Sequence, residues 1–269
     1  MVKIALDAGH GINTAGKRTP DGEREWSFNN KVLLACSARL ATYDNVQILR
    51  LDDPTGSTDV ALKTRTDKAN AWAANVLVSI HHNANAGVWG SHGGTETYVD
   101  PTASAASKAI AAIVHPRIVT AMGLRDRGVK VKDLHMTRES RMPAILTEGG
   151  FMDSSTDIGA LRSDAKLKAQ GEAIAEGIAS YFGLKGGAST SSKPVSVAPQ
   201  KEETKLYKPT ASAIVNSTAT VLKRLEQKED KPLDLQWREK LLKGELTESD
   251  AIGLVFVAID RGHIVGKAE

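Results

Sequence analysis

The sequence predicts an α/β fold in its first 184 residues, followed by a linker and a small all-α C-terminal domain. Short segments rich in β-branched residues alternate with longer segments of helical spacing as far as Leu184, which is the rhythm of an α/β domain. A Ser- and Pro-rich stretch then precedes further helical patterns. The 269 residues allow one or two domains, and 41% hydrophobic with 25% charged residues is ordinary for a globular enzyme.

The expected elements of the first domain can be placed individually. Strands are expected at VKIALDAG (2–9), VQILRL (46–51), NVLVSIH (75–81), GGTETYVD (93–100) and PAILTEGG (143–150). Helices are expected at 25–41, at about 58–73, at 104–122 and in a last segment that ends near Phe182. Gly183 supplies the stop signal of that last helix.

The C-terminal third divides into a linker and a helical domain. Residues 185–206 contain almost no large apolar side chain and are expected to form a flexible linker. Residues 207–269 hold three helical patterns, at 212–227, 232–244 and 247–262, with Pro232 and a Thr247 to Asp250 capping pattern as start signals. This domain is near the lower size limit for independent folding.

Composition excludes several classes of protein. The net charge is only +3 and no basic face is concentrated anywhere, so nucleic acid is not an expected partner. No apolar segment is long enough to span a bilayer, and membrane insertion is not expected. The N-terminus lacks the features of a secretory signal, which predicts synthesis in the cytoplasm. The single Cys36 is expected to be a buried thiol, and Trp26 and Trp72 are expected in the core.

Three residues can serve as metal ligands. His10 lies between two glycines in a tight turn after a strand, Glu25 opens a helix, and His81 closes another strand. Two imidazoles and one carboxylate form a common catalytic zinc set. Each residue alone is a weak signal, since a Gly-rich turn or a lone histidine is more often structural.

A second acidic residue strengthens this hypothesis. Glu148 ends the apolar segment PAILTEGG, where a carboxylate is costly unless it faces a metal, water or a partner. Asp7 is interpreted as a residue that orients a ligand. Three other histidines, His92, His115 and His135, are interpreted as surface or packing residues, and Arg138 with Glu139 are weaker candidates for a substrate groove.

Residues 1–184 resemble the zinc-dependent N-acetylmuramoyl-L-alanine amidases of bacterial autolysins and phage endolysins. The resemblance rests on IALDAGHG, on Glu25 four residues before Asn29, and on VSIHHNAN, GGTETYV and MPAILTEGGFMDSSTD, all in the family's order. It implies a mixed twisted sheet flanked by helices, Zn²⁺ held by His10, Glu25 and His81, and Glu148 as the catalytic carboxylate. Neighbouring side chains on a strand point to opposite faces, so only one of His81 and His82 should reach the zinc, and the resemblance implies that it is His81.

The sequence also departs from the family pattern. Ser154 and Ser155 stand where the family usually has Asn and Pro, so the shape of the loop after Glu148 is left open. The implied reaction is hydrolysis of the amide between N-acetylmuramic acid and L-alanine in peptidoglycan, with water activated at the open fourth position of zinc. Two alternatives stay open, a zinc peptidase that cuts within the stem peptide and a non-catalytic wall-binding protein.

The domain at 207–269 is expected to target the cell wall, since a tethered binding module raises local concentration on an insoluble polymer. Its apolar helix faces also fit a homodimer. Together with the cytoplasmic start, wall-cutting chemistry favours action after release through a phage-made membrane lesion or lysis of a mother cell.

Overall fold

The computed structural model describes residues 1–187, 222–223 and 236–243. The chain divides into two units, Met1–Thr190 and Ser191–Glu269. In the second unit, the helix predicted at 232–244 is present as α8 (Gln236–Lys243). The helix predicted at 247–262 lies outside the described residues, as do most of the linker and all of the helix predicted at 212–227 except Leu222 and Lys223, which are helical.

The first unit is built on one mixed sheet of six strands. They are β1 (Val2–Ala8), β2 (Val46–Arg50), β3 (Val76–Asn83), β4 (Thr95–Val99), β5 (Asp126–Val131) and β6 (Ala144–Phe151). Their order in the sheet is β2-β1-β3-β6-β4-β5. Neighbours among β2, β1, β3 and β6 pair in parallel, whereas β4 runs antiparallel to β6 and parallel to β5. The expected mixed sheet is therefore confirmed.

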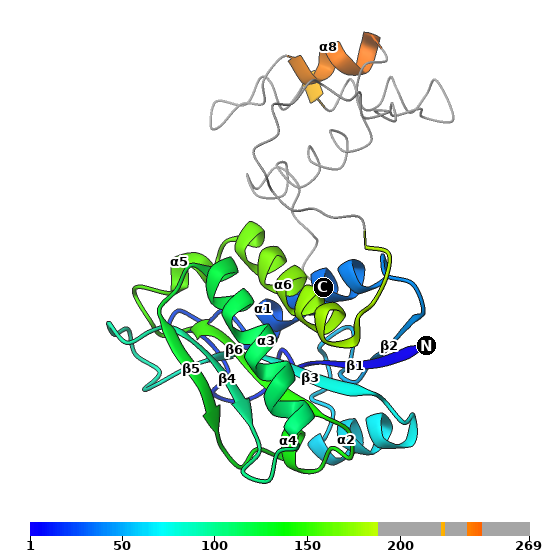
Figure 1. The fold of residues 1–269 in the computed structure, drawn as a ribbon. Coiled ribbons are helices and arrows are strands. Elements are labelled where there is room, and N and C mark those ends of the chain that lie inside the picture. Colours follow the sequence, from blue (N-terminus) through cyan, green and yellow to red (C-terminus); the bar gives the residue numbers. More distant parts are fainter. Residues whose placement is uncertain (188–221, 224–235, 244–269) are drawn as a thin grey trace. The chain divides into compact units, whose positions relative to one another are not determined.

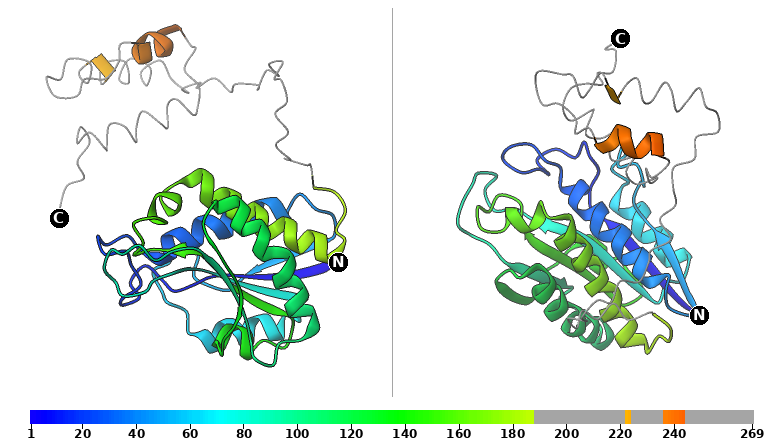
Figure 2. Two further views of the ribbon diagram at one scale, coloured as in Figure 1. Left: turned by 60° about the vertical axis from the view of Figure 1, so that its left-hand side comes forward. Right: turned by 90° about the horizontal axis from the view of Figure 1, so that it is seen from above.

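Helices cover both faces of this sheet (Figures 1 and 2). They are α1 (Glu25–Leu40), α2 (Leu62–Ala71), α3 (Ala105–Met122), α4 (His135–Arg138), α5 (Ile158–Leu161) and α6 (Asp164–Phe182). The long helices α1, α3 and α6 lie on one face, and α2 and α4 lie on the other (Figure 1). α6 ends at Phe182, and Gly183 adopts the left-handed conformation at φ 61°, which confirms the predicted stop.

Two apolar clusters hold these layers together. The larger one joins β1 and β3 to α1, α3 and α6, and its fully buried members include Leu6, Val78, Val32, Ile110 and Ile174. The smaller one packs β1, β3 and β6 against α2 and α4, through residues such as Leu77 and Met136. Because strands β1, β3 and β6 are buried on both faces, their sequences are nearly continuous apolar segments.

The expected core residues take the places predicted for them. Cys36 is fully buried on α1, and burial raises the pKa of its thiol. Trp26 is buried in the larger cluster, while Trp72 is partly buried against the smaller one. No helix in the described part of the chain is long and apolar enough to cross a membrane.

The structure contains elements that the sequence analysis did not predict, namely β5 and the short helices α4 and α5, and two boundaries are shifted. β5 was not predicted, because this edge strand is largely exposed and its sequence DRGVKV has no apolar run. α2 begins at Leu62 instead of about 58, since Asp59 lies in a loop where it pairs with Arg65. Residues 185–187, placed in the linker by the sequence, pair with the turn after α1: Asp44 N donates to Lys185 O and Gly187 N donates to Thr42 O, each at 2.8 Å.

Candidate metal centre and active site

The carboxyl ends of three parallel strands meet at one edge of the sheet. His10 follows β1, His81 lies near the end of β3, and Glu148 lies on β6 directly opposite His81 in the register. The open edge beyond the carboxyl ends of parallel strands is the usual place for a ligand site in α/β folds. Glu25 is the first residue of α1, whose N-terminal end favours a carboxylate through the helix dipole.

The three predicted ligands converge on one point. Glu25 Oε1 lies 2.9 Å from His81 Nδ1, and Glu25 Oε2 lies 3.3 Å from His10 Nε2. One donor atom from each residue lies within 4.8 Å of the others. The two imidazole rings meet edge to face with centroids 4.8 Å apart. The predicted ligands His10, Glu25 and His81 therefore form one cluster that offers two imidazole nitrogens and one carboxylate.

The turn that carries His10 needs a glycine before it. A Cβ on Gly9 would lie 2.0 Å from His81 Cε1, so any larger residue would displace the imidazole from the cluster. His10 itself has a φ of 68°, a left-handed conformation that is costly for a residue with a side chain. The turn therefore keeps His10 in an unfavourable left-handed backbone conformation, at the residue that is the first candidate metal ligand.

The neighbouring His82 points to the opposite face of β3. It is buried, and its Nδ1 lies 2.8 Å from Asn29 Oδ1 on α1. Asn29 Nδ2 in turn donates to Gly9 O at 3.1 Å and to Glu25 Oε1 at 3.3 Å. His82 is thus outside the cluster, and Asn29 supports both the turn and the carboxylate.

Electrostatics prepare the cluster to bind a cation. Burial lowers the pKa of His10 to about 4, so its imidazole is neutral at pH 7 and has a free lone pair. Burial opposes the charged form of Glu25, yet the hydrogen bond from His81 and the charges around it lower the pKa of Glu25 to about 2. The carboxylate is therefore ionised beside the neutral imidazole of His10, whereas the hydrogen bond and charge of Glu25 raise the pKa of His81 against the effect of burial, so His81 must release a proton when a metal binds.

The pKa of Glu148 is shifted in the opposite direction to that of Glu25. Burial raises its pKa to about 8, despite the opposing influence of His81. Its Oε2 atom is buried and has no hydrogen-bond partner among the described residues. A buried carboxylate oxygen without a partner is costly, so this atom is available to a ligand that the described part of the chain does not supply.

A cavity of about 380 Å³ opens at this point, and His10, His81 and Glu148 all line it. Sequence reasoning missed its other polar walls, Lys17, Tyr98 and Lys132. Tyr98 donates to Glu96, a buried carboxylate on β4 that also pairs with Arg127 and Lys130. Tyr98 lies within the segment GGTETYV, one of the segments that resemble the family, and this resemblance could have indicated its place in the cavity. No feature of the sequence indicates that Lys17 and Lys132 line the cavity.

The donor set fits zinc. Two imidazole nitrogens and one carboxylate satisfy its preference for nitrogen and oxygen ligands and leave one position open. The unpartnered Oε2 of Glu148 in the same cavity agrees with a site that receives a metal, water or substrate.

The other singled-out residues have structural partners. Asp7 takes no part in the cluster and pairs with Arg65 at 2.7 Å. His92 pairs with Asp153 at 2.7 Å, and His115 is buried between Thr97 and Asp126. His135 lies 3.2 Å from the hydroxyl of Thr66, and it also lines the cavity, a role that the sequence did not indicate.

Arg138 does not lie in the cavity that contains Glu148. It pairs with Asp133 and Glu139, and it lines a separate cavity of about 370 Å³ with Pro143 and Ala144. Ala144 opens β6, whereas Glu148 lies four residues further along the strand. Arg138 and Glu139 are therefore near β6 in the sequence, but Arg138 lies at the end of that strand opposite to Glu148.

Ser154 and Ser155 close the loop after β6 without the residues usual in the family. Ser154 is buried, and its hydroxyl accepts hydrogen bonds from the backbone N–H of Thr156 and Asp157 at 3.2 and 3.1 Å. Ser155 donates from both its backbone and its hydroxyl to Gly90 O. The loop is therefore fully tied to the segment after β3.

Comparison with known proteins agrees with this geometry. Residues 4–180 match the family described as N-acetylmuramoyl-L-alanine amidase. The chain belongs to that family. It is 37% identical over 187 residues to N-acetylmuramoyl-L-alanine amidase CwlM of Bacillus licheniformis, a match that covers 68% of this chain and 70% of that protein.

The amidase also resembles a phage protein and a solved structure. It is 33% identical over 205 residues to an endolysin of Bacillus phage SPP1, covering 74% of this chain and 71% of the relative. The catalytic domain of the amidase CwlV from Bacillus (Paenibacillus) polymyxa var. colistinus superposes with a TM-score of 0.63 at 31% identity, covering 69% of this chain and 100% of that one. The matched part corresponds to the first unit of this amidase.

Proposed function

We propose that this chain hydrolyses the amide bond between N-acetylmuramic acid and L-alanine in peptidoglycan. The observation that carries the proposal is the convergence of His10, Glu25 and His81 beside a cavity that also contains Glu148. Membership of the amidase family supports the choice of substrate.

In this proposal His10, Glu25 and His81 hold Zn²⁺. When bound there, zinc supplies a Lewis acid that lowers the pKa of a water molecule to about 7 and polarises a carbonyl group. Glu25 supplies the negative charge of the ligand set, and its contacts with both imidazoles keep the three donors at short range. Asn29 supports the set by holding Glu25 and the Gly9 carbonyl.

Glu148 is the proposed proton-transfer residue. Its carboxylate accepts a proton from the attacking water as the water oxygen bonds to the carbonyl carbon, and it then donates that proton to the amide nitrogen as the C–N bond breaks. The products are a lactyl carboxylic acid on the glycan and a peptide with a free N-terminus. Burial raises the pKa of Glu148, which strengthens its hold on the proton that it carries from the water to the amide nitrogen.

We further propose a division of labour along the chain. Residues 1–184, together with the hydrogen-bonded segment 185–187, form the catalytic domain, residues 188–206 a flexible linker, and residues 207–269 a small helical domain that targets the cell wall or forms a homodimer. The relative from Bacillus phage SPP1 is named an endolysin, which supports action on the wall after release from the cell in which the protein is made.

Digestion of purified peptidoglycan followed by mass spectrometry tests the reaction. Amidase action leaves glycan strands free of peptide and intact stem peptides that begin with L-alanine. A zinc peptidase would instead leave truncated peptides still attached to the glycan, and a non-catalytic wall-binding protein would release neither product. Either of these results would contradict the proposed reaction.

Metal removal tests the cofactor. The purified protein is expected to hold about one zinc per chain, and a chelator should abolish activity, which returns when zinc is restored. Elemental analysis and the digestion assay measure both quantities on the same sample. Full activity in a preparation verified as metal-free would overturn this part of the proposal.

A further inference from the structure

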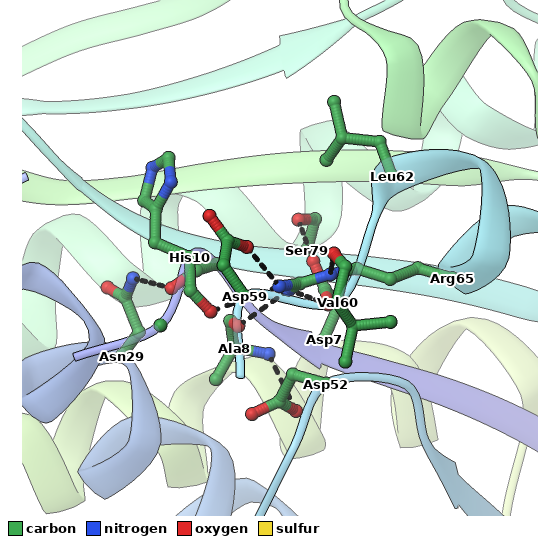
Figure 3. A network of polar contacts seen from close by, with 12 residues as sticks. Asp7, Ala8, His10, Asn29, Asp52, Asp59, Val60, Leu62, Arg65 and Ser79 are labelled. Atoms are coloured by element: carbon green, nitrogen blue, oxygen red, sulfur yellow. Dashed lines mark hydrogen bonds and ion pairs between the residues drawn. The ribbon is translucent and has the colours of Figure 1, made fainter. Parts of the chain in front are cut away.

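Arg65 is a fully buried cation next to the metal site. It lies on α2, and its guanidinium is completely enclosed. A guanidinium carries five N–H donors, and the structure provides five acceptors at 2.7 to 3.0 Å. They are the carbonyl oxygens of Val60, Ala8 and His10 and the carboxylates of Asp7 and Asp59 (Figure 3). Every donor of Arg65 is therefore used.

Two of these acceptors belong to the turn that carries His10. Nη1 donates to Ala8 O at 2.9 Å, and Nη2 donates to His10 O at 3.0 Å. The carbonyl between them, Gly9 O, accepts from Asn29 Nδ2 at 3.1 Å. Three consecutive carbonyls of the turn thus accept hydrogen bonds from side chains, which opposes rotation of their peptide planes.

The same guanidinium connects this turn to the strand that carries the second imidazole. Asp7 accepts from Arg65 at 2.7 Å with one oxygen, and from the hydroxyl of Ser79 at 2.6 Å with the other. Ser79 lies on β3, two residues before His81. The hydrogen bonds therefore run without interruption from α2 through β1 to β3.

Charge balance alone does not account for this arrangement. Asp7 is buried and requires a cation, but one ion pair would satisfy it. A lysine could supply that pair, whereas only a planar guanidinium can reach both flanking carbonyls at the same time. The left-handed backbone of His10, with φ 68°, is the costly feature that these extra bonds offset.

We propose that Arg65 is a positioning residue of the metal site. By holding the carbonyls of Ala8 and His10, it keeps His10 in the left-handed conformation that directs the imidazole toward Glu25 and His81. Substitution of Arg65 then weakens metal binding through His10, because the guanidinium is engaged by five protein acceptors and is not one of the three proposed ligands. The inference rests on the proposed function, because it takes His10 as a metal ligand.

The test compares Arg65→Lys with the unsubstituted full-length chain. Lysine keeps the charge beside Asp7 but cannot hold both carbonyls, so zinc binding measured by competition with a chelator should weaken about 10- to 100-fold. In the metal-free protein, hydrogen exchange at the amides of Gly11 and Ile12 should accelerate at least about tenfold, since their bonds to Thr14 and Gly56 depend on the turn. Exchange within α1 should not change.

Arg39→Lys is the matched control. Arg39 is also a nearly buried arginine with a carboxylate partner, Glu176, but it lies on α1, 14 residues or about 21 Å along the helix from Glu25. Its substitution should leave zinc affinity within about twofold. Equal zinc affinities in Arg65→Lys and the unsubstituted chain, or an equal loss in both variants, would overturn the proposal by assigning Arg65 a structural role alone.

A second variant covers the case in which Arg65→Lys does not fold. The double substitution of Asp7→Asn with Arg65→Gln removes both buried charges together, so neither is left unpaired, and the same loss of zinc affinity is expected. Absence of zinc binding in the unsubstituted chain would instead contradict the proposed function. Exchange at Gly11 and Ile12 in the metal-free protein then decides by itself whether Arg65 holds the turn.

Discussion

Glu25 and Glu148 are carboxylates at the same edge of the sheet, Glu25 buried and Glu148 partly buried, and their surroundings shift their pKa values in opposite directions. Glu25 contacts two imidazoles, and its pKa is lowered to about 2. Glu148 has one oxygen without a partner among the described residues, and burial raises its pKa to about 8. The first environment suits a permanent anion that binds a cation, and the second suits a group that exchanges a proton.

This contrast predicts opposite effects of removing each charge. Glu148→Gln should keep its zinc and lose turnover by about 10² to 10⁴, the usual contribution of a positioned acid or base. Glu25→Gln should lose zinc, because the ligand set loses its only anion. Zinc content and wall hydrolysis are measured on both variants together. Near-normal hydrolysis by zinc-loaded Glu148→Gln would remove Glu148 from the mechanism, and loss of zinc from that variant alone would mean that the two roles are exchanged.

At the scale of elements, the close approach of α1 and α6 sets the position of Glu25. Gly171 on α6 faces the backbone of α1, and a Cβ there would lie 2.3 Å from Val32 O. The same helix α1 carries Glu25 at its first residue, so the depth of this helix contact determines where the carboxylate lies above the sheet. A helical glycine that permits backbone contact has a packing role.

The helix contact predicts that Gly171→Ala destabilises the protein. Alanine normally favours a helix over glycine by about 1 kcal/mol, but overpacking at this interface costs about 1 to 3 kcal/mol and should exceed that gain. Gly159→Ala on α5 is the control, since nothing lies within 4 Å of its Cβ position, and it should be neutral or stabilising. Urea unfolding gives both changes. An equal or higher stability of Gly171→Ala would show that α1 and α6 separate at little cost.

At the scale of the whole molecule, the first unit contains every residue of the proposed active site. The fold extends beyond Leu184, because residues 185–187 hydrogen-bond to the turn after α1. These bonds join the C-terminal end of the first unit to the start of β2. The boundary relevant to a separate catalytic domain is therefore Gly187.

A truncated protein that ends at Gly187 is expected to fold and to cut solubilised wall fragments as fast as the full chain. It should act more slowly on intact sacculi, where a targeting domain raises local concentration. Ending at Leu184 should cost a further 1 to 3 kcal/mol, roughly the worth of two lost backbone hydrogen bonds. Activities on the two substrates and urea midpoints are compared. Equal rates on intact sacculi with and without residues 188–269 would refute the targeting role.

Local signals in the sequence were sufficient for most elements and for the metal cluster. Nearly continuous apolar segments such as those of β1, β3 and β6 favour central strands, because such segments are typical of strands buried on both faces of a sheet. Neighbouring parallel strands bring their carboxyl ends together, so the sequence predicts His10 and His81 at one edge of the sheet. β5 escaped prediction because an exposed edge strand carries little apolar pattern.

The sequence by itself determined the mixed α/β architecture, the family and the identity of the clustered residues, because each depends on patterns within a few neighbouring positions. Tertiary structure alone decided the role of Arg65, the polar walls supplied by Lys17 and Lys132, and the distance of Arg138 from Glu148. These features depend on which side chains from separate elements meet in space. The residues around Arg65 in the sequence do not indicate that its charge is buried. Three of its acceptors, Asp7, Ala8 and His10, lie 55 to 58 residues away in the chain.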